Sequence, residues 1–212
     1  MSIELVFASK NSHKLKEVER IVQAACKDFS IVGLHQWSDA PDVIESGTTF
    51  AANALLKARA LHEHTGRSVI ADDSGICVDA LNGMPGIFSA RWAGTHGKDQ
   101  ENLNLLLSQL ADVPDARRGA QFVCAVAIVL EDGTERVVEG LLDGSITRQP
   151  RGDDGFGYDP IFQPTGLNLT TAQLDAVHKD LISHRGQAMR AAIAELKSLY
   201  NLGCGGDCAC KA

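Results

Sequence analysis

The sequence lacks three features, and each absence excludes a class of protein. None of its apolar runs approaches the roughly 20 residues that a membrane-spanning helix needs. Basic residues are not in excess: 20 Lys and Arg against 27 Asp and Glu give a formal net charge of -7, which argues against a general nucleic-acid binder. No basic leader precedes the apolar stretch at residues 3–8, so we expect no signal peptide. We therefore expect a soluble, cytoplasmic protein that binds neither membranes nor nucleic acid.

Internal repeats and long linkers are also missing from the sequence. The 212 residues, of which 44% are hydrophobic, are enough to bury one large core. We expect residues 1–202 to form a single domain of two lobes. Residues 203–212 are rich in Cys and Gly, and two interpretations stay open for them: a disordered tail, which we expect, or a soft-metal site built from Cys204, Cys208 and Cys210.

Hydrophobic periodicity predicts strands and helices that alternate along the chain. Buried strands are expected at residues 3–8, 30–34, 69–71 and 122–130, the third of them ending on the pair Asp72 and Asp73. Apolar stripes at helical spacing predict helices at residues 15–25, 50–61, 103–110 and 189–200. The pair Asp132-Gly133 predicts a tight hairpin turn. The expected fold is α/β, with a mixed, mainly central sheet flanked by helices and two lobes with an active-site cleft between them.

A first polar cluster, Ser9, Asn11 and Lys14, follows the first expected strand. The chain has neither of the common glycine-rich phosphate loops at this point. A helix N-terminus nevertheless attracts phosphate through its unpaired backbone N–H groups, and Lys14 adds a positive charge. The alternative is ordinary helix capping with Lys14 in solvent.

A second cluster lies on one face of the next expected helix. Thr49, Asn53 and Lys57 recur at intervals of four, and Glu45 stands in the loop before them. Lys57 falls beside the apolar stripe of that helix. Such a lysine either reaches past the stripe to solvent or projects into a cleft.

The third cluster is the acidic pair Asp72 and Asp73 at the expected end of a buried strand. Ligands of open α/β sheets bind outside strand ends. Adjacent carboxylates point in different directions, so one is expected to face the site while the other holds the turn. One or two carboxylates together with substrate phosphates are what Mg²⁺ prefers. The alternative is a polar turn that only ends the strand.

Two further clusters could recognise a base. Phe156 stands among glycines at residues 155–160 and could stack on a base, or it could be a core aromatic in a turn. Lys179, His184 and Arg185 supply donors that match the O6 and N7 acceptors of a 6-keto purine and would repel the amino group of adenine. The alternative for the latter group is a helix start capped by Ser183, with Arg185 in solvent.

Together, the motifs at residues 9–14, 47–50, 53–58, 71–75, 85–91, 155–160 and 183–186 resemble those of the inosine triphosphate pyrophosphatase family. The resemblance runs from about residue 6 to residue 196. It implies a house-cleaning enzyme that needs Mg²⁺ and hydrolyses non-canonical purine nucleoside triphosphates (ITP, dITP and XTP). The products would be the monophosphate and pyrophosphate, and the enzyme would be a homodimer.

The same resemblance implies roles for individual residues. Asp73 would be the general base and, with Glu45, a metal ligand. Residues 85–91 would be structural rather than catalytic. The residues that would bind the substrate are Ser9, Lys10, Asn11, Ser12, His13, Lys14, Lys57, Ser74, Phe156, Gly157, Tyr158, Asp159, Lys179, His184 and Arg185.

The chain departs from the family pattern at two positions. Ala52 stands where a Glu is usual, which leaves open how many protein ligands a metal has, and His178 stands where an acidic residue is usual. Two other functions stay open. A pyrophosphatase for pyrimidine or modified nucleotides would not need Lys179, His184 and Arg185. A non-catalytic nucleotide sensor is suggested by Ala52.

Overall fold

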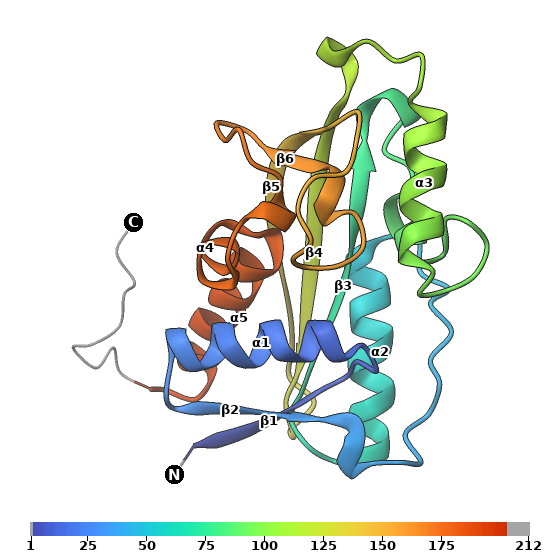
Figure 1. Ribbon diagram of the computed structural model, residues 1–212. Helices are drawn as coiled ribbons and strands as arrows, with labels where there is room; N and C mark the ends of the chain where they lie inside the picture. The colour runs from blue at the N-terminus through green and yellow to red at the C-terminus, as the bar shows by residue number, and fades with distance from the viewer. Residues whose placement is uncertain (1, 203–212) are drawn as a thin grey trace. The chain divides into compact units, whose positions relative to one another are not determined.

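The computed structural model describes residues 2–202, in which strands and helices alternate as far as the fourth strand and are followed by two more strands and two helices (Figure 1). The strands are β1 (Ile3–Phe7), β2 (Phe29–Gly33), β3 (Val69–Val78), β4 (Gly119–Val129), β5 (Glu135–Ile146) and β6 (Phe162–Pro164). The helices are α1 (Ser12–Ala25), α2 (Phe50–Thr65), α3 (Asp99–Gln109), α4 (Ala176–Ile182) and α5 (His184–Leu199), with short 3-10 turns between some of them. The helices predicted from apolar periodicity are thus confirmed, and α4 is an addition to them.

The strands form one sheet in the order β2-β1-β3-β4-β5-β6. β1 pairs in parallel with both β2 and β3, whereas β5 and β6 pair antiparallel. Gly133 adopts a φ of +82° in the turn from β4 to β5, a conformation that Gly enters without steric cost. The predicted α/β fold with a mixed sheet is therefore confirmed. None of the helices in residues 2–202 combines the length and the apolar character that crossing a bilayer requires.

The prediction that the third strand ends on its acidic pair is wrong. β3 continues through Asp72 and Asp73 to Val78 and is ten residues long. Both carboxylates are buried, yet each has cationic side chains within ion-pair distance. Because these cations offset part of the cost of burying the two charges, the strand does not have to turn toward solvent at this point.

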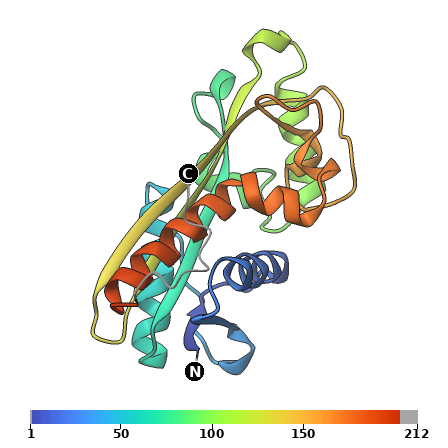
Figure 2. The ribbon, with the colours of Figure 1, turned by 90° about the vertical axis from the view of Figure 1, so that its left-hand side faces the viewer.

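The chain divides into two compact units, and the long strands β3, β4 and β5 contribute residues to both. Of the described residues, unit 1 contains 2–73, 125–140 and 185–202. Its core includes Ala54, Ala58 and Leu61 of α2, packed with Val69 and Ala71 of β3. Figure 1 shows α2 beside β3. In the same unit, α5 lies along the hairpin of β4 and β5 (Figure 2).

Unit 2 contains residues 74–124 and 141–184 and has a core of its own. The predicted leucine stripe of α3 lies in this core, where Leu103, Leu106 and Leu110 are buried. Arg118 is buried nearby and donates to the carbonyl oxygens of Ile146, Leu110 and Thr147 at 2.6–2.9 Å. A buried guanidinium group is thus satisfied by backbone acceptors.

The two units and their cores do not test two predictions about the domain organisation of the chain. A single domain over residues 1–202 and a cleft between two lobes both stay predictions. The predicted tail, residues 203–212, lies outside the described residues.

Gly75, in the second half of β3, should not tolerate a side chain. A Cβ at this position would lie closer to Gly86 O and Ser89 Oγ than real Cβ atoms approach, and Ser89 Oγ is itself held by Ile76 N–H at 2.9 Å. We expect Gly75→Ala to lower the free energy of unfolding by about 1–3 kcal/mol, as overpacking does. Urea unfolding measures this loss. An unchanged midpoint would show that the segment after Pro85 moves aside freely.

Candidate active site

Asp72 and Asp73 are neighbours in β3, so their side chains point to opposite faces of the sheet. They have different partners as a result. Asp73 Oδ1 lies 3.3 Å from Lys57 Nζ, and Asp73 Oδ2 accepts a hydrogen bond from Asn53 Nδ2 at 3.2 Å. The two carboxylates therefore belong to separate networks, as the sequence led us to expect.

Lys57 joins Asp73 to Glu45. Its Nζ donates to Glu45 Oε1 at 2.7 Å, and its side chain is only 15% exposed. The alternative in which this lysine reaches solvent is therefore wrong, and projection into a cleft stays a prediction. Burial alone would lower the pKa of Lys57, but Asp73 and the other carboxylates around it outweigh burial and raise that pKa above its usual value.

The charge on Asp73 is unfavourable in the folded protein. Burial raises the pKa of this carboxyl above its usual range, and Glu45 raises it further, while Lys57, Lys14 and the Asn53 amide act in the opposite direction. A carboxyl whose ionisation is disfavoured in this way gains from any additional positive charge placed beside it.

Asp72 belongs to a buried network of four charges. Lys14 Nζ lies 3.1 Å from Asp72 Oδ2, and Arg185 donates to the same oxygen through Nε and Nη2 at 3.2 and 3.1 Å. Arg185 Nη1 also donates to Glu17 Oε2 at 2.7 Å. Burial by itself would raise the pKa of Asp72, but Lys14 and Arg185 hold that pKa well below its usual value. The alternatives that left Lys14 and Arg185 in solvent are therefore wrong.

The N-terminus of α1 carries the predicted phosphate-binding segment. Asn11 caps the helix, because its Oδ1 accepts hydrogen bonds from the backbone N–H groups of His13 at 2.9 Å and Lys14 at 3.1 Å. Lys10 forms an ion pair with Asp42. A pocket opens at this helix end, and the residues that line it include Ser9, Lys10, Asn11, Ser12, His35 and Trp37.

In unit 2, a buried carboxylate organises the predicted base-binding turn. Lys179 Nζ lies 2.5 Å from Asp159 Oδ2, and the backbone N–H of Phe156 donates to the same oxygen at 2.9 Å. Thr171 Oγ1 donates to Asp159 Oδ1 at 2.8 Å. Lys179 Nζ also lies 5.2 Å from the centre of the Phe156 ring, within the range of a cation–π contact. Gly155 permits this packing with a φ of +78°.

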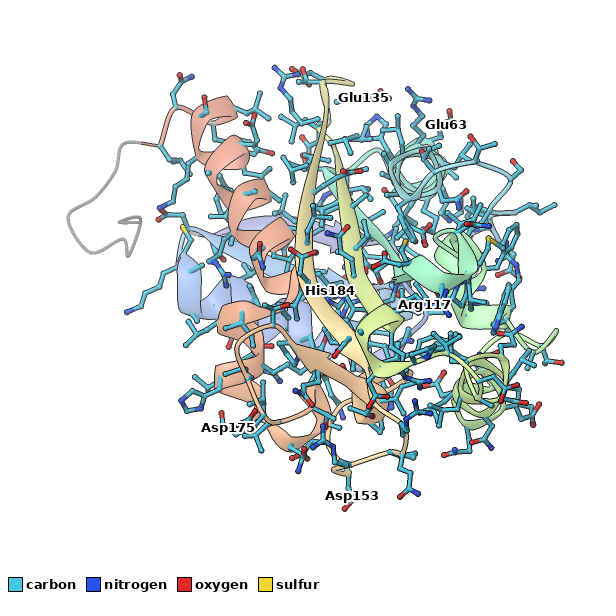
Figure 3. The ribbon with its side chains drawn as sticks, turned by 90° about the horizontal axis from the view of Figure 1, so that it is seen from above. Glu63, Arg117, Glu135, Asp153, Asp175 and His184 are labelled. Atoms are coloured by element: carbon cyan, nitrogen blue, oxygen red, sulfur yellow. The ribbon has the colours of Figure 1, made fainter. Side chains whose placement is uncertain are left out.

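The other predicted base-binding residues of unit 2 have different surroundings. His184 begins α5 (Figure 3) and stacks on Phe122, with ring centres 4.7 Å apart and planes inclined by 11°. Tyr158 is buried and donates its hydroxyl to Ser89 O at 2.8 Å, and burial raises the pKa of that hydroxyl. Gly157 N–H donates to Asp99 Oδ2 at 3.0 Å. Ser74 follows the acidic pair in β3 and is half-buried.

The predicted site residues thus fall into two groups, one in each unit. Arg185 was grouped with the base-binding residues, but it donates hydrogen bonds to the carboxylates of Asp72 and Glu17 in unit 1. Sequence reasoning missed Glu17 altogether. A signal for it existed, since Glu17 is three residues after Lys14 and adjoins the buried stripe of Val18 and Ile21. A buried charge on a helix calls for a partner.

The residues around Asp73 fit a hard divalent cation. Ion pairs around Asp72 and Asp73 join the carboxylates of Glu17, Glu45, Asp72 and Asp73 to the cationic side chains of Lys14, Lys57 and Arg185. Two of these carboxylates already share the ammonium group of Lys57. Within residues 2–202 no group of three or more His, Cys, Asp or Glu side chains is arranged to hold a metal. A cation here would therefore take two protein carboxylates and complete its shell with other oxygens.

Carboxylates that can hold a metal ion, set beside lysines that can neutralise phosphate charge, are what an enzyme acting on a phosphorylated substrate requires. The comparison with known proteins narrows this class. Residues 5–195 match the model of the Ham1 family, and the chain belongs to that family. This confirms the family resemblance predicted from the motifs. A protein of Streptomyces coelicolor named dITP/XTP pyrophosphatase is 55% identical over 195 residues, which cover 92% of this chain and 98% of that protein.

Solved structures agree with this assignment. The crystal structure of a nucleoside-triphosphatase, or dITP/XTP pyrophosphatase, from Mycobacterium abscessus has 49% sequence identity and a TM-score of 0.72, with 92% of this chain and 98% of that chain covered. The Ham1 protein of Staphylococcus aureus has 40% identity and a TM-score of 0.81, with coverage of 92% and 99%. These proteins share the fold of this chain over nearly its whole length.

Proposed function

We propose that this protein is a hydrolase that converts non-canonical purine nucleoside triphosphates, namely ITP, dITP and XTP, to the monophosphate and pyrophosphate. The observation that carries the proposal is the cluster in which Lys57 joins Glu45 to Asp73. The names of relatives at about 50% identity over most of their length support the same reaction for this chain.

The chemistry assigned to this cluster is attack of water on the α-phosphorus. Asp73 takes a proton from the attacking water, the new P–O bond forms at the α-phosphorus, and the bond to the bridging oxygen breaks, so that pyrophosphate leaves. Glu45 and Asp73 would hold Mg²⁺, which when bound would neutralise phosphate charge and favour the ionised form of Asp73. Lys57, Lys14 and the N-terminus of α1 would bind the phosphates.

Selection of the base is assigned mainly to unit 2. Phe156 would stack on the purine, and Lys179, fixed by Asp159, would donate to an acceptor on its edge. His184 and Arg185 stay proposed contacts to O6 and N7. In the structure Arg185 is bound to Asp72 and Glu17, so its part in base recognition requires it to use donors that those carboxylates leave available.

A substrate panel tests the proposal. We expect pyrophosphate, and no orthophosphate, from XTP, ITP and dITP, with kcat/KM for ATP lower by at least about 100-fold, because the site loses a donor–acceptor match on the amino group of adenine. Pyrophosphate and orthophosphate are measured separately, with and without Mg²⁺. Equal turnover of ATP and ITP would contradict base selection, and preferred turnover of pyrimidine triphosphates would favour the alternative pyrophosphatase.

A requirement for Mg²⁺, a homodimer and a cytoplasmic location stay predictions.

A further inference from the structure

Asn53 is completely buried, although it lies only one turn into α2. Its side chain makes two hydrogen bonds to different parts of unit 1. Asn53 Nδ2 donates to Asp73 Oδ2 at 3.2 Å, and Asn53 Oδ1 accepts from the backbone N–H of Gly47 at 2.8 Å. Because an unsatisfied polar group is costly when buried, both bonds matter to this side chain.

The two partners determine which way the amide of Asn53 faces. A backbone N–H only donates, so the atom that faces Gly47 must be the amide oxygen. The amide nitrogen must then face Asp73, whose ionised carboxylate only accepts. An Asp at position 53 could therefore satisfy Gly47 but not Asp73.

Two donors on one face of α2 hold the two oxygens of Asp73. Lys57 Nζ contacts Oδ1 and Asn53 Nδ2 contacts Oδ2. Residues four apart on a helix share a face, so one rigid element supplies both donors and fixes the plane of the carboxylate. Asn53 is the neutral member of this pair, and it holds Asp73 without adding charge that would repel a cation.

The same amide anchors the segment that carries Glu45. Gly47 lies two residues after Glu45, within residues 37–49, which contain no helix or strand. Gly47 packs so closely that a Cβ on it would lie 2.7 Å from Asn53 Oδ1. The Asn53 side chain therefore links the Glu45 segment to Asp73 through the backbone of that segment, whereas Lys57 links the two carboxylates directly.

We propose that Asn53 is a positioning residue, which orients the Asp73 carboxylate and fixes the Glu45 segment against it through Gly47. This inference rests on the proposed function, in which Asp73 and Glu45 act as a pair. It adds a residue that works through both of them rather than on the nucleotide.

Kinetics of Asn53→Leu test the inference, with Asn102→Leu as the matched control. Asn102 is also buried and its side chain also makes two hydrogen bonds, in this case both to backbone groups: it accepts from Ala93 N–H at 2.7 Å and donates to Ala90 O at 3.2 Å. We expect Asn53→Leu to lower kcat for XTP about 100-fold and to change KM less than threefold, because displacement of a reacting group mainly costs rate. Asn102→Leu should lose similar stability and keep kcat within threefold. Equal losses of kcat in both variants, or an unchanged kcat in Asn53→Leu, would overturn the inference.

A second readout does not depend on turnover. Mn²⁺ binding without nucleotide, followed by electron paramagnetic resonance, should weaken about tenfold in Asn53→Leu, because residues that orient metal ligands contribute about that much, and should be unchanged in Asn102→Leu. Unchanged Mn²⁺ affinity in Asn53→Leu would contradict the link to Glu45. If the wild-type protein does not hydrolyse XTP, the proposed function fails, and the Mn²⁺ comparison still decides the role of Asn53.

Asn53→Asp covers the case in which Asn53→Leu does not fold. It keeps the shape of the side chain and the acceptor for Gly47, but it exchanges the donor to Asp73 for a second carboxylate oxygen and adds a negative charge beside Asp73. A loss of kcat of about 100-fold supports the inference, and a kcat within threefold of the wild type overturns it.

Discussion

Replacing Asp73 with Asn should remove most of the activity and leave the fold intact. We expect kcat for XTP to fall about 100- to 10,000-fold, the range that a general base contributes. The amide keeps the shape of the carboxylate but cannot take a proton from water. Because burial raises the pKa of Asp73, the folded protein disfavours its charge, and removing that charge costs little stability. Pyrophosphate release at saturating XTP and urea unfolding measure the two effects.

Asp72→Asn is the matched control, since it makes the same change at the adjacent residue. The pKa of Asp72 is held well below its usual value, so its ionised form stabilises the fold at neutral pH. We expect Asp72→Asn to lower the free energy of unfolding more than Asp73→Asn does. Activity of Asp73→Asn within tenfold of the wild type would rule out Asp73 as the base. A wild-type protein that binds XTP without hydrolysing it would instead be the sensor.

Replacing Arg185 with Met should destabilise the protein strongly. Arg185 is 2% exposed and makes contacts of 2.7–3.2 Å with Asp72 and Glu17. Removal of one partner from a buried ion network leaves the remaining charges uncompensated, which costs about 3–5 kcal/mol. The free energy of unfolding in urea at pH 7 measures this cost. A loss below about 1 kcal/mol would show that the network is solvated.

Arg59→Met is the control for this substitution. Arg59 makes two hydrogen bonds to Glu135, at 2.6 and 2.7 Å, but its side chain is 50% exposed (Glu135 is labelled in Figure 3). Exposed ion pairs contribute about 0–1 kcal/mol, so the stability of this variant should remain close to that of the wild type.

The difference in unfolding free energy between the wild type and Arg185→Met should also shrink as the pH falls below about 4. Wild-type Asp72 has a lowered pKa, so the stability that it contributes is present above the pKa of the unfolded chain and is lost as the pH falls.

Local patterns in the sequence predicted most of the helices and their buried faces. Val18, Ala54 and Met189 were each placed on an apolar stripe, and each is buried. Apolar periodicity depends only on residues a turn or two apart, so a single sequence contains it. The mixed sheet followed from the alternation of these elements and from the hairpin at Gly133.

The length of β3 could not be predicted in the same way. Asp72 and Asp73 look like a strand end because buried charges are costly. The cations that compensate Asp72 come from Lys14 and Arg185, 58 residues earlier and 113 residues later in the chain (72 - 14 = 58; 185 - 72 = 113). No local pattern reveals a partner at such a separation.

The candidate site, too, could be predicted from the sequence only in part. The motifs pointed to Glu45, Lys57 and Asp73, and the structure brings these three side chains together. Sequence spacing placed Asn53 on the face of Lys57 but could not indicate its bonds to Gly47 and Asp73. The partners of Arg185 are likewise set by tertiary packing, because its sequence neighbours suggested a role in base recognition.

Hydrolysis of XTP in ¹⁸O-labelled water tests the central claim most directly. Attack of water on the α-phosphorus places one labelled oxygen in the monophosphate and none in pyrophosphate. Mass spectrometry of the two products after partial turnover therefore locates the bond that breaks, and ATP under the same conditions measures base selection. We predict label in XMP alone and little product from ATP. Label in pyrophosphate, release of orthophosphate or equal turnover of ATP would contradict the account.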